Sequence, residues 1–252
     1  MTIHPDAAQG FAAGAEAYER GRPSYPDAAV AYMAEVLDIR PGRVVLDLAA
    51  GTGKLTRLLA SLGAELIAVE PVAEMGAQLH AQLPAVQVLD GTAEALPLPG
   101  DSVDAVTVAQ EFHWFDPAPA LAEIARVLRP GGGLALVWNS RDESVPWVAE
   151  FTRVINWHAF QQGHYRLQPW DAVVASNSNR FTPVERAGFP YEQWLDRAGF
   201  ADRIASISYI AAMAEPARSE MIERAVAVTV GLPEPFPLPY TTDVWTCRLR
   251  SA

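Results

Sequence analysis

The chain has 252 residues, about half of them hydrophobic, so it is long enough to bury one sizeable core. Its formal net charge is -11, and because an acidic surface repels phosphate backbones and anionic lipid, we expect neither nucleic-acid nor membrane partners. A single cysteine, Cys247, excludes an intrachain disulfide and suits a reducing compartment. No apolar run reaches the roughly 20 residues of a membrane-spanning helix, and residues 1–10 do not resemble a signal peptide, so we expect a cytoplasmic protein.

Residues 1–26 are rich in small residues, glycine and proline, and we expect an N-terminal arm with little regular structure. Beyond this arm, short apolar runs alternate with segments whose apolar residues recur at helical spacing. The apolar runs predict strands at 44–48, 66–69, 86–89, 103–109 and 134–138. The helical stripes predict a helix that begins at Pro26-Asp27 and further helices that include 55–62, 72–83 and 121–128. This alternation over residues 27–140 is typical of a doubly wound, mostly parallel α/β sheet with helices on both faces.

Residues 141–200 differ in character, because they carry many aromatic residues and show no regular strand pattern. We expect them to form a mostly helical cap. Residues 201–252 return to the sheet, with a predicted strand near 204–210, a helix at 216–230, a proline-rich loop at 232–239 and a last strand at 244–249. Because the chain has no internal repeat and no linker, we expect a single domain with a cap and a seven-stranded sheet.

The segment Asp47-Leu48-Ala49-Ala50-Gly51-Thr52-Gly53 connects the first predicted strand directly to a helix. Glycine in such a turn permits positive φ and lets the backbone pass close to a ligand. In open α/β sheets, ligands bind beyond the carboxyl ends of the strands, where the strand order reverses. Asp47 is therefore placed to receive an ammonium group, and Glu70, which ends the second strand, is placed to accept hydrogen bonds from ribose hydroxyls.

Three nucleotide-binding motifs compete for this turn. A phosphate-binding P-loop fails, because Leu48 and Leu55 occupy two of the positions that the motif requires. A dinucleotide fingerprint would start at Gly51 and needs a third glycine where Thr56 stands, so it is damaged but stays open. The third motif, D-x-G-x-G-x-G, binds S-adenosylmethionine (SAM), and Asp47, Ala49, Gly51 and Gly53 match it with alanine in place of the first glycine.

Four ordered motifs extend this match: V-L-D-L-A-A-G-T-G-K at 45–54, A-V-E-P at 68–71, G-T-A-E-A-L-P-L at 91–98 and L-R-P-G-G at 128–132. With them, residues 25–147 resemble the class I SAM-dependent methyltransferases, in the branch of the ubiquinone/menaquinone-biosynthesis and trans-aconitate methyltransferase-like proteins. The L-P-Y-T-T segment at 238–242 also resembles this branch. The resemblance implies a Rossmann-like methyltransferase fold with an antiparallel last strand.

The resemblance also implies roles for individual residues. Asp47, Ala49 and Gly51 would line the methionine half of SAM, and Glu70 would hold the ribose. Gln110 follows the fourth strand, where relatives place residues under the methionyl group.

The residues that the resemblance places around the adenine are Pro71, Met75, Thr92 and Ala93. Thr92 stands where many relatives carry an aspartate that meets the adenine amino group, so its hydroxyl and the next amide would take over part of that contact. In the arm, Tyr18 and Arg22 resemble a segment that closes over SAM.

His113 is the candidate general base for methyl transfer. It follows the fourth strand in Gln110-Glu111-Phe112-His113-Trp114-Phe115, and a histidine side chain titrates near neutral pH. A packed, hydrogen-bonded histidine that fixes the loop is the alternative, because the same branch often carries an aromatic-His-Trp run whatever its substrate.

The candidate substrate-binding residues are Trp114, Trp138, Asn139 and Arg141. The two tryptophans would face the crevice and stabilise a sulfonium by cation–π attraction, or simply form the pocket wall. Asn139 and Arg141 would bind a polar or acidic substrate group, or belong to a polar turn. The aromatic cap suits an apolar or aromatic small molecule, and no cysteine or histidine cluster has the spacing of a metal site.

The sequence therefore predicts an enzyme, monomeric or homodimeric, that transfers a methyl group from SAM to a small-molecule acceptor. Three alternatives stay open. They are a SAM-binding enzyme that catalyses a cyclisation or rearrangement without methyl transfer, a nicotinamide-dependent oxidoreductase, and a SAM-binding module without enzymatic activity.

Overall fold

A computed structural model describes residues 21–161 and 169–250 of the chain. The predicted arm residues 1–20, including Tyr18, lie outside these ranges. Tertiary contacts group the chain into two compact units. The core unit comprises residues 25–139, 165–189 and 242–252, and the second unit comprises residues 1–24, 140–164 and 190–241. Within the described residues, no helix combines the length and the apolar character needed to cross a membrane.

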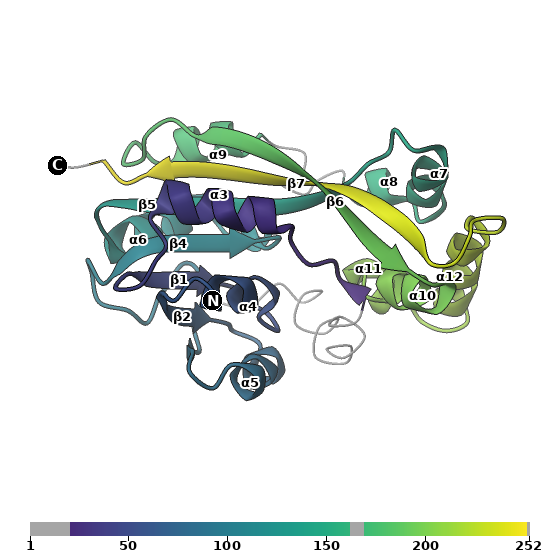
Figure 1. Cartoon of the computed structure of the whole chain (residues 1–252), viewed down its shortest axis with the longest axis horizontal. Helices are drawn as coiled ribbons and strands as arrows, with labels where there is room; N and C mark the ends of the chain where they lie inside the picture. The colour runs from purple at the N-terminus through teal and green to yellow at the C-terminus, as the bar shows by residue number, and fades with distance from the viewer. Residues whose placement is uncertain (1–20, 162–168, 251–252) are drawn as a thin grey trace. The chain divides into compact units, whose positions relative to one another are not determined.

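Seven strands form one sheet in the order β3-β2-β1-β4-β5-β7-β6. Their bounds are β1 (Val44–Leu48), β2 (Glu65–Val69), β3 (Gln87–Leu89), β4 (Val103–Ala109), β5 (Leu128–Arg141), β6 (Glu185–Leu195) and β7 (Phe236–Arg248). The pairs β1/β2, β1/β4, β2/β3 and β4/β5 are parallel. Figure 1 shows β7 running against its neighbours β5 and β6. The predicted fold class, a mostly parallel seven-stranded sheet with an antiparallel last strand, is confirmed.

Helices of the core unit cover both faces of its sheet. One face carries α3 (Asp27–Leu37), α4 (Lys54–Ala60) and α5 (Ala73–Gln82), whose buried side chains pack on Val45, Ala68 and Ala105. The opposite face carries α6 (Pro117–Val127) and α9 (Trp170–Asn177), which pack on Leu46, Val69 and Val106. Because successive strand residues point to opposite faces, each strand contributes to both layers of the core.

The second unit has its own hydrophobic core. Its helices are α7 (Pro146–Val154), α8 (Trp157–Gln161), α10 (Arg197–Ala205), α11 (Ser208–Ala211) and α12 (Ala217–Ala227). The rings of Phe151, Phe200 and Phe236 are fully buried and meet edge to face, with centroids 4.8 Å apart for the first pair and 5.7 Å apart for the second. Such pairs add stability beyond the burial of their area.

The predicted helical cap is corrected at residues 185–195, which form the strand β6. Phe189, Tyr191, Gln193 and Leu195 alternate with exposed residues, of which Trp194 is 60% exposed. This period of two is the pattern of a half-buried strand. The concentration of aromatic residues masked the alternation in the sequence.

The predicted sixth strand at 204–210 is also wrong, because this segment belongs to α10 and α11. Its buried apolar residues are Phe200, Ile204, Ile207 and Ile210, which are spaced by three or four residues as on a helix. The Ile207 amide donates to the carbonyl oxygen of Ile204, as in a helical turn.

The predicted proline-rich loop at 232–239 is corrected in its second half, since β7 begins at Phe236. Phe236, Leu238 and Tyr240 are buried at alternate positions. The two prolines between them did not prevent a strand.

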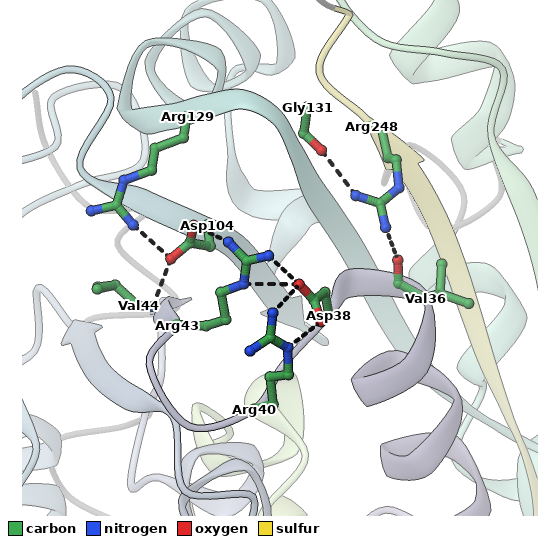
Figure 2. Close-up of polar contacts among 9 residues, drawn as sticks. All are labelled: Val36, Asp38, Arg40, Arg43, Val44, Asp104, Arg129, Gly131 and Arg248. Carbon is green, nitrogen blue, oxygen red and sulfur yellow. Dashed lines mark hydrogen bonds and ion pairs between the residues drawn. The ribbon is translucent and has the colours of Figure 1, made fainter.

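A polar network joins the amino ends of three strands in the core unit (Figure 2). The Asp104 carboxylate in β4 accepts hydrogen bonds from the Val44 amide of β1 at 2.8 Å and from Arg129 of β5 at 2.6 Å. Arg43 donates to the same carboxylate at 3.1 Å. Although partial burial opposes ionisation, the Val44 amide and the Arg129 guanidinium keep the pKa of Asp104 below its usual value.

Two further arginine contacts bind α3 to this end of the sheet. Arg43 also pairs with Asp38, which directly follows α3. Arg248 of β7 donates to the carbonyl oxygens of Gly131 and Val36, and thereby links β7, β5 and α3 (Figure 2).

We expect Asp104→Asn to lower the free energy of unfolding by about 1–3 kcal/mol, because an amide leaves part of this charge-assisted network unpaired. Urea denaturation of the variant and the wild type checks this. Asp101→Asn is the control, because Asp101 is exposed and asparagine tolerates its positive φ of 53°. Equal losses in the two variants would contradict a structural role for Asp104.

Candidate functional site

The sheet order reverses between β1 and β4, since β2 and β3 lie on one side of β1 while β4 and β5 lie on the other. A doubly wound sheet binds its ligand at such a switch point, beyond the carboxyl ends of the strands. The loop that follows β1 and the loop that follows β4 are therefore the two loops that frame the site. Both contain residues that the sequence predicts to bind a cofactor.

The loop after β1 has a strained backbone. Gly51 and Gly53 have φ of 58° and 86°, and Ala49 has φ of 54° although it carries a Cβ atom. A Cβ added at Gly53 would lie 2.9 Å from the Leu79 side chain, whereas one at Gly51 would meet only the Met75 sulfur at 3.9 Å. The backbone at Gly51 thus has open space beside it, which fits the close approach of a ligand.

Asp47, at the end of β1, is 1% exposed and is held by two hydroxyl groups. Thr56 donates to one carboxylate oxygen at 2.6 Å and Thr107 of β4 donates to the other at 2.9 Å. Burial raises the pKa of Asp47 to about 6, although the hydroxyls of Thr56 and Thr107 and the Thr56 amide oppose the rise. Asp47 therefore ties β1 to β4 and to the first turn of α4.

Glu70, which follows β2, connects two loops. Its carboxylate accepts from the Gly51 amide at 2.7 Å and from the Val72 amide at 2.9 Å. Burial raises the pKa of Glu70 to about 7, against the lowering effect of these two amides. The residue is 6% exposed, and each carboxylate oxygen keeps a lone pair that can accept a further hydrogen bond.

Thr56 and Thr107 are functional residues that the sequence analysis missed. Thr56 counted there only as a missing glycine of the dinucleotide motif, yet its hydroxyl and amide both contact Asp47. The signal available in the sequence was its position in the first turn after the glycine loop, within reach of a strand-end carboxylate. Thr107 had no comparable signal, because its contact depends on the pairing of β1 with β4.

The four residues predicted around an adenine are Pro71, Met75, Thr92 and Ala93, all of the core unit. The Met75 sulfur lies near Gly51, so the residue is placed beside the glycine loop. Thr92 is partly buried in a turn closed by a hydrogen bond from the Ala95 amide to its carbonyl oxygen, at 3.1 Å. The Ala93 methyl group belongs to the hydrophobic core, so only its backbone is left to contact a ligand, and its role stays a prediction.

The loop after β4 begins at Gln110, which like Ala49 has a positive φ, of 69°, although it is not a glycine. Its amide donates to the carbonyl oxygen of Val137 in β5 at 2.9 Å. Strained residues at both strand ends that flank the switch point, Ala49 and Gln110, are typical of functional sites.

His113 is 5% exposed and lies among aromatic rings. Its ring centroid is 4.4 Å from that of Trp114 and 5.2 Å from that of Trp138, and Trp138 packs in turn on Trp170 at 5.5 Å. The structure thus brings three of the predicted catalytic and substrate residues into one cluster of the core unit. The close packing is what a loop-fixing histidine requires, and the general-base role of His113 stays a prediction.

Three other predicted residues are divided between the two units. Asn139 belongs to the core unit, where its side-chain oxygen accepts from the Thr242 hydroxyl at 2.6 Å. Arg22 and Arg141 belong to the second unit, and Arg22 donates to the carbonyl oxygen of Ser206 at 2.8 Å. Tyr18 lies outside the described residues.

Known proteins resemble this chain in sequence. A family model described as "Methyltransferase domain" matches residues 46–136. An "Uncharacterized methyltransferase" of Mycobacterium tuberculosis is 42% identical over 219 residues, which cover 87% of this chain and 85% of the relative. The demethylmenaquinone methyltransferase of Beutenbergia cavernae is 33% identical over 168 residues, covering 66% of this chain and 65% of that protein.

Solved structures share the fold. A putative methyltransferase from an antibiotic biosynthesis pathway of Anabaena variabilis has a TM-score of 0.62 at 22% identity, covering 89% of this chain and 98% of that chain. The [4+2]-cyclase SpnF has a TM-score of 0.56 at 20% identity, covering 92% of this chain and 84% of that chain. At these identities the likeness shows the fold alone.

We expect Ala49→Gly to leave the free energy of unfolding unchanged or to raise it by up to about 1 kcal/mol, because glycine relieves the positive φ of this position. The neighbouring Ala50→Gly is the matched control, since Ala50 has no positive φ and glycine there only adds freedom to the unfolded chain. Chemical denaturation of both variants checks this. A larger loss for Ala49→Gly than for Ala50→Gly would contradict strain at Ala49.

The raised pKa of Glu70 predicts a pH-dependent stability. The folded protein binds this proton more tightly than the unfolded chain, so the stabilisation is complete below about pH 4.5 and is lost as the pH rises through about 7. Between these limits, the unfolding free energy of the wild type should fall relative to that of Glu70→Gln by on the order of 3 kcal/mol. Denaturation series for both proteins at several pH values measure this; a constant difference would refute the assignment.

Proposed function

Because the chain belongs to the class I SAM-dependent methyltransferases, we propose that it transfers the methyl group of SAM to a small-molecule acceptor of apolar or aromatic character. The main support for a cofactor site is the pair of buried carboxylates, Asp47 and Glu70. They fix the backbone of the glycine loop at the switch point of the sheet and leave the space beside Gly51 open. Enzymes with other activities share this fold. The proposal therefore depends on the residues of the site and not on the fold.

We propose that Glu70 accepts hydrogen bonds from the two ribose hydroxyls through its remaining lone pairs. Asp47 has a positioning role. Its hydrogen bonds from two threonine hydroxyls fix the loop whose backbone would line the methionine half of SAM. Gly51 and Gln110 present backbone to the same half from the loops after β1 and β4. Met75, beside Gly51, packs on the adenine together with Pro71, Thr92 and the backbone of Ala93.

When bound, SAM would supply a methyl group on a sulfonium, and the acceptor would take this methyl group while the sulfur keeps the electron pair of the C–S bond. An oxygen or nitrogen acceptor would then lose a proton. Positioning is the main contribution of the protein, and it can supply roughly 7–11 kcal/mol. The aromatic cluster of Trp114, Trp138 and His113 would exclude water from the reacting groups, and His113 would take the proton where the acceptor needs a base.

A SAM-dependent cyclisation or rearrangement is the alternative function, since this fold also occurs in a cyclase. Such an enzyme would bind SAM through the same residues but would leave its methyl group in place. Incubation with methyl-labelled SAM and a panel of small-molecule acceptors, followed by mass spectrometry, distinguishes the two. Label in an acceptor supports methyl transfer, whereas an altered but unlabelled acceptor supports the alternative.

We expect Glu70→Gln to weaken the binding of S-adenosylhomocysteine by about tenfold to a hundredfold, because hydrogen bonds to a charged carboxylate are lost. Isothermal titration calorimetry measures this. Glu74→Gln is the matched control, because Glu74 is exposed in the first turn of α5, four residues away, and should bind like the wild type. A wild type without affinity for this ligand would refute the proposed function.

A further inference from the structure

Among the described residues of the second unit, the two arginines Arg141 and Arg203 have no acidic side chain as an ion-pair partner, and of these Arg141 is half-buried and Arg203 is buried. Arg141 ends β5, and Arg203 lies in α10 and is 5% exposed. In the described part of the chain, the Nε and Nη2 atoms of Arg141 and the Nη1 atom of Arg203 are sealed from solvent and have no hydrogen-bond acceptor. A buried donor without an acceptor is costly, and a buried charge without a counter-charge is more so.

The two guanidinium groups influence each other. Burial, together with the positive charge of Arg203, lowers the pKa of Arg141 to about 10. Arginine side chains stay charged in proteins, so this unit keeps two like charges in a poorly solvated place. The carboxylate that acts on Arg141 is Glu143, which is exposed and pairs with His158 at 2.9 Å instead.

The free donors of Arg141 have a specific geometry. The Nε and Nη2 atoms form one edge of the guanidinium plane, where two parallel N–H groups match the two oxygens of a carboxylate or phosphate. The plane itself is fixed from the side, because the guanidinium carbon lies 4.3 Å from the centre of the Trp157 ring and 5.2 Å from that of Phe151. Stacking thus orients the group without using its donors.

The hydroxyl group of Tyr240 and the side-chain amide of Gln193 lie next to these arginines. Asp142 next to Arg141 donates its amide to Pro239, so Arg141 lies opposite Tyr240 in the antiparallel pair of β5 and β7. The Tyr240 hydroxyl accepts from Nε of Arg203 at 3.1 Å and donates to Gln193 at 3.4 Å. Arg203 is therefore oriented by a neutral partner, which leaves its charge uncompensated.

We propose that Arg141 and Arg203 form a binding site in the second unit for an oxyanion group, a carboxylate or a phosphate, carried by a small molecule. The oxyanion supplies the acceptors that the three sealed nitrogen atoms lack, and the rings of Trp157 and Phe151 beside it suit an aromatic body on the same molecule.

The proposed site also predicts the thermal stability of the ligand-free protein. Functional sites often retain groups that reduce stability. Arg141→Met keeps the apolar stem against Trp157 but removes an uncompensated buried charge. We expect this variant to unfold at the same temperature as the wild type or at a higher one. If Arg141 were a purely structural residue, its loss would instead lower the unfolding temperature.

The test uses three probes with one phenyl ring: benzoate, phenyl phosphate and benzyl alcohol. Scanning calorimetry at constant ionic strength measures the unfolding temperature of the wild type, Arg141→Met, Arg203→Met and Arg224→Met. Arg224 is exposed on α12 of the same unit and serves as the charge-matched control. Titration calorimetry with S-adenosylhomocysteine is performed on the same four proteins.

We expect benzoate or phenyl phosphate, but not benzyl alcohol, to raise the unfolding temperature of the wild type and of Arg224→Met, and the stronger of the two anions identifies the oxyanion. Arg141→Met and Arg203→Met should weaken that response by about tenfold or more in concentration, while their affinity for S-adenosylhomocysteine is unchanged.

No response in the wild type, an equal response in all four proteins, or a lowered unfolding temperature of ligand-free Arg141→Met would overturn the inference. These results are independent of the proposed function, which the binding of S-adenosylhomocysteine tests separately.

Discussion

The candidate cofactor site depends on one constraint, which is that the backbone after β1 must turn at positive φ while staying accessible. Such a turn needs anchors, and two buried carboxylates provide them. Asp47 fixes the strand end to α4 and β4, and Glu70 fixes the Gly51 amide to the loop after β2. Burial raises the pKa values of both carboxylates although the hydrogen bonds from protein donors oppose the rise, so the charge state of each becomes coupled to whatever binds beside it.

Much of the fold could be predicted from the sequence, because the parallel half of the sheet has strong local signals. Strands β1 to β4 are short apolar runs, helical stripes separate the first three of them, and the predicted bounds of β1 and β4 match the structure. The region from 185 to 248 was harder. The aromatic residues of β6 suggested a helical cap, and the isoleucines of α10 and α11 suggested a strand, because short apolar segments satisfy both periods.

The candidate site also has a part that the sequence reveals and a part that only the fold reveals. The glycine loop and Glu70 are visible in the sequence, because strand-end position alone gives them their role. The partners that define their chemistry are not, since Thr107 reaches Asp47 only through strand pairing. Arg141 could be singled out as a polar residue after the predicted fifth strand, but the influence of Arg203 on it, 62 residues later in α10, could not. Long-range contacts of this kind need the fold.

Three of the boundaries between the two units fall inside strands, in β5, β6 and β7. Side chains on a strand alternate between two faces, so insertion or deletion of one residue between Val137 and Arg141 would turn Arg141 to the opposite face and move it away from Tyr240. Substitutions within these strands leave this alternation intact, whereas a change of strand length by one residue does not. The second unit should evolve by substitution, with its length in these three strands held fixed.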